Sequence, residues 1–197
     1  MTTVLVPVKA FEQAKFRLSS ALSPAERADL ARDMATHVVK AAAPFPVAIV
    51  CDDDGVRQWA EDLGAEVVWC PGTGLNGAVQ RGYEHLGAQG VDHVIVTHGD
   101  LPHAAGYEEL RPWPGVTLVP DRHGSGTNVI AVSPSLGFEF SYGVGSFNRH
   151  VAEAVRLRQG MRIVRSASLG WDVDVPEDLL AEDLVPGDMG ATGRPSS

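Results

Sequence analysis

The chain has 197 residues, of which 44% are hydrophobic and 21% charged, and its formal net charge is -9 at pH 7. This composition is that of one globular domain with a sizeable core, and the negative charge argues against nonspecific binding to nucleic acid or to an anionic membrane surface. The longest apolar runs are too short to span a bilayer and the N-terminus lacks a basic signal-peptide start, so we expect a cytoplasmic protein.

The N-terminal half alternates strand and helix patterns. An apolar run at 4–8 predicts the first strand, and Ser23–Pro24–Ala25–Glu26 has the form of a capping box that opens a helix to about Ala43. The other elements expected in this half are strands at 47–51, 66–69 and 93–97 and helices at 55–63 and 75–86. The alternation predicts a parallel sheet covered by helices on both faces.

The second half has a different pattern. Strands are expected at 116–119 and 128–133 with no room for a crossover helix between them, which favours antiparallel or mixed pairing. A helix at about 147–158, a strand at 162–165 and a last helix from Pro176 follow. We therefore predict one α/β domain over residues 1–184, with a mixed, mostly parallel central sheet flanked by helices. Residues 185–197, rich in Gly, Pro and Ser, are predicted to form a disordered tail.

Three acidic residues follow predicted strands. Asp172 and Asp174 alternate where a strand is expected to end, so their carboxylates should lie on one face and repel each other. Asp100 follows the strand at 93–97. A divalent ion between the three would remove the repulsion and leave positions for substrate phosphates. The alternative interpretation makes Asp100 and Asp174 helix N-caps.

Positive residues and glycine loops are expected at the same edge of the sheet. Lys9, Lys15 and Arg17 follow the first strand and suit a triphosphate, although they could equally form a solvated loop; no Walker-type Gly-x-x-x-x-Gly-Lys pattern occurs. Thr127 and the loop 143–146 could present hydroxyl and backbone N–H groups to a second phosphate. Two ordinary turns are the alternative for these loops.

Six motifs in this order resemble one enzyme family. They are Val6–Pro7–Val8–Lys9 with Ala14–Lys15–Phe16–Arg17–Leu18, Gly74–Leu75–Asn76–Gly77–Ala78–Val79, Gly99–Asp100–Leu101–Pro102, Gly126–Thr127–Asn128, Phe140–Ser141–Tyr142–Gly143–Val144–Gly145–Ser146 with His150, and Asp172–Val173–Asp174–Val175–Pro176–Glu177–Asp178–Leu179. The set is similar to that of the 2-phospho-L-lactate and phosphoenolpyruvate guanylyltransferases of deazaflavin coenzyme F-420 biosynthesis. The likeness extends to about Leu184; Ala10 and His103–Ala104 depart from the usual family pattern.

The resemblance implies a single-domain nucleotidyltransferase fold, GT-A-like and Rossmann-like, that uses GTP and Mg²⁺. It implies roles for ten residues: Asp100, Asp172 and Asp174 as metal ligands and catalytic residues, Lys15 as catalytic residue and phosphate ligand, Lys9 and Arg17 as GTP phosphate ligands, Asn76 at the guanosine, and Thr127, Gly143 and Ser146 at the acceptor phosphate. It also suggests a homodimer and functional coupling to the next transferase of the pathway.

The acceptor implied by the resemblance is a phosphorylated three-carbon acid. Phosphoenolpyruvate, 2-phospho-L-lactate and the further variant 3-phosphoglycerate each carry one phosphate and one carboxylate, so the site residues do not separate them. The arginine-rich, bacterial character of the chain favours phosphoenolpyruvate. Two other functions stay open. One is a nucleotidyltransferase for molybdopterin or a sugar phosphate, which the absence of a Leu-Ala-Gly-Gly first loop disfavours. The other is a catalytically silent nucleotide-binding subunit.

Overall fold

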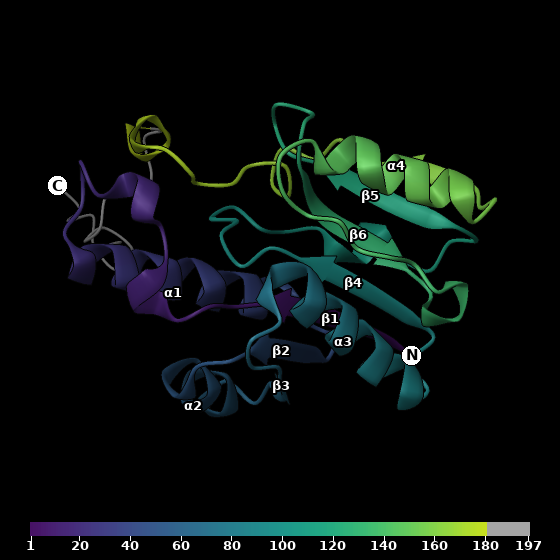
Figure 1. The fold of residues 1–197 in the computed structure, drawn as a ribbon, viewed down its shortest axis with the longest axis horizontal. Helices are drawn as coiled ribbons and strands as arrows, with labels where there is room; N and C mark the ends of the chain where they lie inside the picture. Colours follow the sequence, from purple (N-terminus) through teal and green to yellow (C-terminus); the bar gives the residue numbers. More distant parts are fainter. Residues whose placement is uncertain (181–197) are drawn as a thin grey trace, which may run out of the picture.

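The chain forms one seven-stranded sheet with helices on both faces (Figure 1). The computed structural model describes residues 1–180. The strand order is β3-β2-β1-β4-β6-β5-β7, so neighbouring strands are often distant in sequence. The predicted domain boundary at residue 184 and the predicted tail lie outside the described residues.

The first four strands are parallel. They are β1 (Thr2–Pro7), β2 (Val47–Cys51), β3 (Glu66–Trp69) and β4 (His93–Thr97). β1 pairs in parallel with both β2 and β4, and β2 pairs in parallel with β3. Because the chain moves outward from β1 to β3 and then returns to β4 on the other side of β1, the sheet reverses its strand order between β1 and β4. Such a reversal opens a crevice at the carboxyl ends of the two strands.

The other three strands make the sheet mixed, as predicted. They are β5 (Val116–Pro120), β6 (Thr127–Val132) and β7 (Met161–Ile163). β6 runs antiparallel to both of its neighbours, β4 and β5, whereas β7 is parallel to β5. The start of β6 therefore lies beside the end of β4, since Thr97 pairs with Val129. This register brings the loop before β6 to the crevice.

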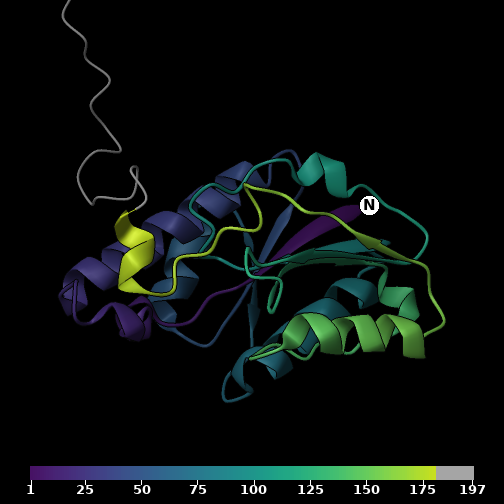
Figure 2. The same cartoon turned by 90° about the horizontal axis from the view of Figure 1, so that it is seen from above.

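Within residues 1–180, four α-helices cover the sheet in two layers (Figure 2). α1 (Pro24–Ala41) and α2 (Asp54–Asp62) pack on one face, and α3 (Gly74–Ala88) and α4 (Ser146–Arg156) pack on the other. The predicted capping box is present, because the Ser23 hydroxyl accepts from Glu26 N and the Glu26 carboxylate accepts from Ser23 N. None of the helices in residues 1–180 is long and apolar enough to cross a membrane.

Strand alternation divides the core between the two faces of the sheet. In β1, Val4 and Val6 point into the core under α1, while Leu5 points to α3. Gly82 on α3 lets the helix approach this strand, because a Cβ there would lie 2.9 Å from both Leu5 methyl groups. The sheet is thus buried on both faces, as the continuous apolar strands require.

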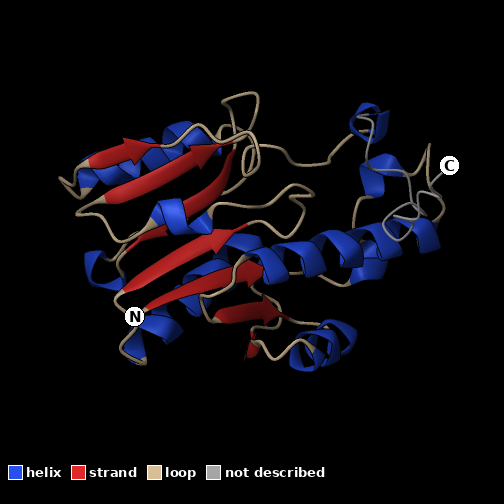
Figure 3. Cartoon of the chain, turned by 180° about the vertical axis from the view of Figure 1, so that it is seen from behind, coloured by secondary structure: helices blue, strands red, loops and turns tan. Residues whose placement is uncertain are grey.

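A third, smaller core lies beyond the sheet. α1 extends past the ends of the strands (Figure 3), and its Leu30 and Met34 pack there against Leu18 and Val173. Five short 3-10 helices complete the described structure, of which the second and fifth lie at this extension: Phe11–Gln13, Phe16–Leu18, Tyr107–Leu110, Pro134–Leu136 and Pro176–Leu180. The loop after β1 and the C-terminal segment are therefore held together at one end of α1.

One expectation about the C-terminal segment was wrong, because residues 171–174 are irregular rather than the end of a strand. The expected last helix does begin at Pro176, and within the described residues it is the 3-10 helix Pro176–Leu180. The alternation of Asp, Val, Asp and Val imitates a half-buried strand. Here Val173 instead enters the small core at α1, and no neighbouring strand pairs with this stretch.

Candidate functional site

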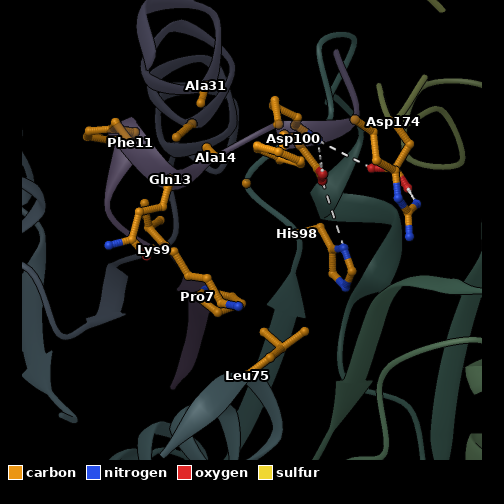
Figure 4. A pocket seen from close by; sticks show the side chains of 16 residues that line it. Pro7, Lys9, Phe11, Gln13, Ala14, Ala31, Leu75, His98, Asp100 and Asp174 are labelled. Carbon is orange, nitrogen blue, oxygen red and sulfur yellow. Dashed lines mark hydrogen bonds and ion pairs between the residues drawn. The ribbon is translucent and has the colours of Figure 1, made fainter. Parts of the chain in front are cut away.

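A cavity of about 400 Å³ occupies the crevice between the ends of β1 and β4 (Figure 4). Its walls come from the end of β1 and the loop after it, Ala31 and Ala35 in the middle of α1, Leu75 of α3, the loop after β4, and Asp174. Segments from both ends of the described chain thus meet at the reversal of the sheet. A second cavity of about 310 Å³ shares the wall around Pro7, Lys9 and Leu75 and continues toward the ends of β2 and β3.

Lys15 lies at the centre of the acidic residues. Its Nζ is 2.5 Å from Asp100 Oδ2, 2.5 Å from the carbonyl oxygen of Val173 and 3.6 Å from Asp174 Oδ1. Its side chain is only 9% exposed. Burial alone would lower the pKa of Lys15, but the negative charges of Asp100, Asp174 and Asp172 outweigh it and raise the pKa. The ammonium is therefore a permanent positive charge among the predicted metal ligands.

The backbone at Lys15 is held in an unusual conformation. Its φ of 54° and ψ of 37° are left-handed, which costs a residue other than glycine about 1 kcal/mol. Arg27, buried on α1, donates from Nη1 to the carbonyl oxygen of Ala14 at 3.2 Å and fixes the preceding peptide. Strained residues of this kind concentrate where a side chain must be aimed. Here the strain turns the lysine from the loop toward Asp100.

Asp100 is charged and incompletely paired. Burial alone would raise the pKa of its carboxyl, but the positive charge of Lys15 and the neighbouring His98 lower it below the usual range. Its Oδ2 accepts from Lys15, whereas Oδ1 is buried without a hydrogen-bond partner among the described residues. His98 Nδ1 lies 3.8 Å from that oxygen. No α-helix or 3-10 helix follows directly at residue 101, so the N-cap interpretation of Asp100 was wrong.

Asp172 faces the same group of charges. Asn128 Nδ2 donates to its Oδ1 at 3.3 Å. Burial raises the pKa of Asp172, and the negative charges of Asp100 and Asp174 raise it further. The loop after β4 and the C-terminal segment thus bring two carboxyl groups near each other, as predicted. The raised pKa of Asp172 indicates that the Lys15 ammonium alone does not neutralise these two carboxyl groups.

Asp174 is the third acid of the group and is more exposed. It pairs with Lys15 and, through Oδ2, with Arg17 Nη1 at 3.1 Å. It does not cap the final helix: Asp178 Oδ2 instead accepts from the backbone N–H groups of Asp174 and Val175 at 2.7 and 2.9 Å. The N-cap interpretation of Asp174 was therefore also wrong. Asp174 remains available at the wall of the cavity.

Arg122, which the sequence analysis did not single out, holds the acidic segment in place. Its guanidinium lies 4.2 Å from the centre of the Trp171 ring, donates to the carbonyl oxygen of Asp172 at 3.2 Å and pairs with the buried carboxylate of Asp178. One side chain thus connects the loop after β5 to three positions of the segment. Nothing in the local sequence around Arg122 indicates these contacts, because they depend on residues about fifty positions away.

The predicted phosphate ligands do not all converge. Lys15 and Arg17 both reach Asp174, but Lys9 lies across the cavity from Asp100, His98 and Asp174 (Figure 4). Lys9 and Arg17 are exposed, and Lys9 also borders the second cavity. The roles of these cations at GTP remain predictions. Their separation along the cavity corresponds to an elongated anion rather than to a single phosphate.

Thr127 and Ser146, the predicted acceptor ligands, are neighbours. Thr127 N donates to Ser146 Oγ at 3.1 Å, and Ser146 N donates to the carbonyl oxygen of Gly143 at 3.0 Å. Gly143 has a φ of +117°, a conformation that favours glycine, and it places the loop at the N-terminus of α4. His150 of α4 completes the group, with Nδ1 3.0 Å from Thr127 Oγ1.

Asn76 lies apart from both cavities' walls. Its Oδ1 accepts from Tyr142 N at 2.6 Å and its Nδ2 donates to Tyr142 O at 3.4 Å, so it connects α3 to the loop before Gly143. This pairing uses one of the two N–H donors of the amide and one of the two lone pairs of its oxygen. The predicted contact with guanosine remains a prediction, and the observed contact positions Tyr142. The side chain of Tyr142 packs between His98 and His150, with ring centres 5.1 and 5.0 Å away.

The acids do not form a complete metal site by themselves. Within residues 1–180, no three His, Cys, Asp or Glu side chains gather closely enough to hold a metal ion. Two features nevertheless fit a divalent cation: the buried Asp100 Oδ1 without a partner, and the raised pKa of Asp172 beside it. Mg²⁺ commonly binds one or two carboxylates and takes its other ligands from water and substrate phosphates. The residues present therefore suit Mg²⁺ that arrives with a nucleotide.

Comparison with known proteins shows which family the chain is similar to. The family model described as "Guanylyl transferase CofC like" matches residues 2–192. The phosphoenolpyruvate guanylyltransferase of Sphaerobacter thermophilus is 35% identical, over 91% of this chain and 91% of its own length. The 2-phospho-L-lactate guanylyltransferase of a Methanocaldococcus species is 30% identical, over 94% of this chain and 82% of its own.

Solved structures show the same fold at lower sequence identity. A nucleotidyl transferase from Methanothermobacter thermautotrophicus superposes with a TM-score of 0.65 at 15% identity, covering 91% of this chain and 94% of its own. A candidate nucleotide-diphospho-sugar transferase from Desulfovibrio desulfuricans gives a TM-score of 0.76 at 18% identity, covering 95% and 89%. The predicted nucleotidyltransferase fold is confirmed.

Proposed function

Because the chain belongs to the family of CofC-like guanylyl transferases, we propose that it transfers GMP from GTP to a phosphorylated three-carbon acid and releases pyrophosphate. Phosphoenolpyruvate is the favoured acceptor and 2-phospho-L-lactate the next. The observation that carries the proposal is the convergence of Lys15, Asp100 and Asp174 beside a cavity at the reversal of the sheet.

In this proposal the nucleotide lies along the two adjacent cavities, which share the wall around Pro7, Lys9 and Leu75. The triphosphate would lie near Lys15 and Arg17, and the guanosine would extend past Lys9 into the second cavity. Lysine and arginine side chains are suited to this task, because each remains charged and can donate several hydrogen bonds to phosphate oxygens. Binding would draw Lys15 from its carboxylate partners toward the phosphates, so its charge would be shared between the two.

Mg²⁺ would be held by Asp100 and Asp172, with Asp174 close to the same group. The ion supplies neutralisation of the phosphate charges and polarisation of the bond that breaks. Among the described residues, Asp100 Oδ1 has no hydrogen-bond partner that would have to be displaced when Mg²⁺ binds. The Asp172 carboxyl, whose pKa is raised by burial and by its acidic neighbours, would lose its proton more readily when a cation is near.

The acceptor acid would bind at the N-terminus of α4. Its phosphate would contact Thr127, Gly143 and Ser146, which lie at the N-terminus of α4. A phosphate oxygen of the acid attacks the α-phosphorus of GTP, an oxygen–phosphorus bond forms, and the bond to pyrophosphate breaks. Since the attacking oxygen is already negative, no general base is required. The protein contributes orientation and charge neutralisation.

The product would join GMP and the acid through a reactive phosphate–phosphate linkage. Such a product is best consumed quickly, which is consistent with the proposed coupling to the next transferase of the pathway. We also propose a cytoplasmic location, where GTP is available, and a homodimer as suggested by the family.

The deciding experiment is pyrophosphate release from GTP and Mg²⁺ with mass spectrometry of the product. Phosphoenolpyruvate, 2-phospho-L-lactate, 3-phosphoglycerate, molybdopterin and a sugar phosphate are offered separately as acceptors. Release with one acid and a product of the matching mass would establish both activity and acceptor. Release only with molybdopterin or a sugar phosphate would assign another nucleotidyltransferase activity. GTP binding with no release for any acceptor, even with the next transferase present, would identify a silent subunit.

A further inference from the structure

A buried histidine lies directly behind the proposed acceptor ligands. His150 of α4 is 0% exposed, and both ring nitrogens have partners. Nε2 lies 3.0 Å from the backbone nitrogen of Ser141, and Nδ1 lies 3.0 Å from Thr127 Oγ1. The rings of Tyr142 and Phe138 flank the imidazole, with centres 5.0 and 5.9 Å away. The ring is therefore fixed in orientation.

These contacts determine where the proton of His150 lies. The N–H of Ser141 can only donate, so Nε2 must accept, and the proton of the neutral ring is on Nδ1. Burial lowers the pKa of His150 to about 4, helped by the positive charges of Arg149 and His98 and opposed by Glu153. The ring is thus neutral at physiological pH. Its Nδ1–H donates to the Thr127 hydroxyl oxygen.

The hydrogen bond from His150 limits what the Thr127 hydroxyl can do. Its oxygen accepts from Nδ1–H, so its own proton must point elsewhere, and residues 1–180 provide no hydrogen-bond acceptor for it. Ser146 is in the same state, because its oxygen accepts from Thr127 N and its proton has no acceptor within that range. Two adjacent hydroxyl groups are left as donors. A pair of donors suits an anion such as a phosphate.

We propose that His150 is a positioning residue that fixes the Thr127 hydroxyl as a hydrogen-bond donor to the phosphate of the acceptor acid. This inference rests on the proposed function, because it takes Thr127 as an acceptor ligand. His150 is buried and acts through Thr127 without touching the acid. Its effect should therefore appear in the affinity for the acceptor and not in that for GTP.

The first test reads the tautomer directly. Nitrogen NMR of the imidazole in the full chain should show His150 with its proton on Nδ1 and with no titration between pH 5.5 and 8. A proton on Nε2, or a midpoint near the ordinary value of 6.5, would overturn the proposal. The His37 ring, which makes one contact to the carbonyl oxygen of Ala104, serves as an internal reference outside the site.

The second test separates positioning from packing with two substitutions. The amide of His150→Asn can replace Nδ1 and retain the bond to Thr127, whereas that of His150→Gln can replace Nε2 and retain the bond to Ser141. We expect the Gln variant to raise the KM for the acceptor about tenfold with an unchanged KM for GTP, corresponding to one hydrogen bond to a charged group. The Asn variant should stay near the wild type. Equal effects of both, or no effect of Gln, would contradict the proposal, and His37→Gln should change neither constant.

A binding measurement separates this inference from the proposed function. Calorimetry with phosphoenolpyruvate, on chain saturated with a nonhydrolysable GTP analogue and Mg²⁺, should give the same order of affinities: wild type and the Asn variant tighter, the Gln variant about tenfold weaker. If this order holds while the wild type releases no pyrophosphate, the proposed transfer fails and the positioning role stands. If the order is absent while the wild type is active, the positioning role fails alone.

Discussion

At the level of single residues, the most informative feature is a lysine placed among three acids. Lys15 forms ion pairs with Asp100 and Asp174. It forms neither a hydrogen bond with Asp100 Oδ1 nor an ion pair with Asp172, so both can still bind a metal ion. The alternation of Asp172 and Asp174 in the sequence correctly indicated a need for positive charge. It could not indicate that a residue nearly 160 positions earlier supplies part of it.

Asp100→Asn should reduce turnover by about 10²–10³-fold and leave the chain folded, since the substitution removes one charge from the group that neutralises the phosphates. Steady-state pyrophosphate release and a thermal unfolding curve are the two measurements. Asp62→Asn, at an exposed position on α2 whose carboxylate accepts from Gln58, is the matched control. Turnover at the wild-type rate in Asp100→Asn would contradict the assignment of this residue.

Ser146→Ala should raise the KM for the acceptor about tenfold and that for GTP much less, because it removes a hydroxyl donor from the acceptor end. Initial rates with each substrate varied in turn give both constants. Ser135→Ala, in the 3-10 helix Pro134–Leu136 away from the site, provides the comparison. An equal rise in the KM for GTP and in the KM for the acceptor would contradict the assignment of Ser146 to the acceptor phosphate.

At the level of elements, the sequence predicted the regular parts of the fold well. Strands such as His93–Thr97 and the capped helix α1 follow from local patterns of apolar residues and from Ser23 and Glu26, and both are confirmed. The irregular segments were harder. Trp171–Asp174 has a strand-like alternation but packs against α1 through Val173, because tertiary contacts outweigh local pattern there.

The candidate site was predictable to the extent that it follows strand ends. Lys15, Asp100, Asp172 and Asp174 were named from the sequence, and the structure brings them together. Arg122 and His150's contacts were not predicted, since each depends on a partner brought close only by the fold. The parallel strands determine the edge at which loops meet. The strands do not determine which side chains of these loops contact each other.

The segment with Asp172 and Asp174 should depend on Arg122. Arg122→Met should destabilise the chain by about 2 kcal/mol, because the carboxylate of Asp178 and the carbonyl oxygen of Asp172 lose a charged donor. Turnover should fall as well, since the acids lose their alignment. Urea unfolding and initial rates measure the two effects.

Arg122→Lys is the control for that experiment. It keeps the positive charge but not the planar fork that stacks on Trp171 while it donates to two acceptors. An intermediate loss is expected. If the Met and Lys variants both behave as the wild type, Arg122 does not hold the segment.

At the level of the whole molecule, stability should decrease in acid between about pH 6.5 and pH 4. Burial lowers the pKa of His93 to about 4, as it does for His150. The unfolded chain therefore binds protons in this window that the folded chain does not, so the free energy of unfolding rises with pH there, by up to about 1.4 kcal/mol per pH unit for each group. Above pH 6.5 neither form is protonated and the effect ends.

Urea unfolding at pH 7, 6 and 5 measures this dependence. The slope with pH should be smaller in His93→Gln and in His150→Gln, because each removes one of the two groups. A slope that persists in the double variant His93→Gln/His150→Gln would mean that other groups cause it.

The contacts of Lys15 with Val173 and of Arg17 with Asp174 join positions 158 and 157 apart in the chain. During synthesis, Lys15 and Arg17 therefore leave the ribosome long before Asp172 and Asp174 are added to the chain. A nascent chain can form the sheet and expose both cations while the carboxylates are still missing. The arrangement delays assembly of the proposed catalytic centre until nearly all of the described fold has been made.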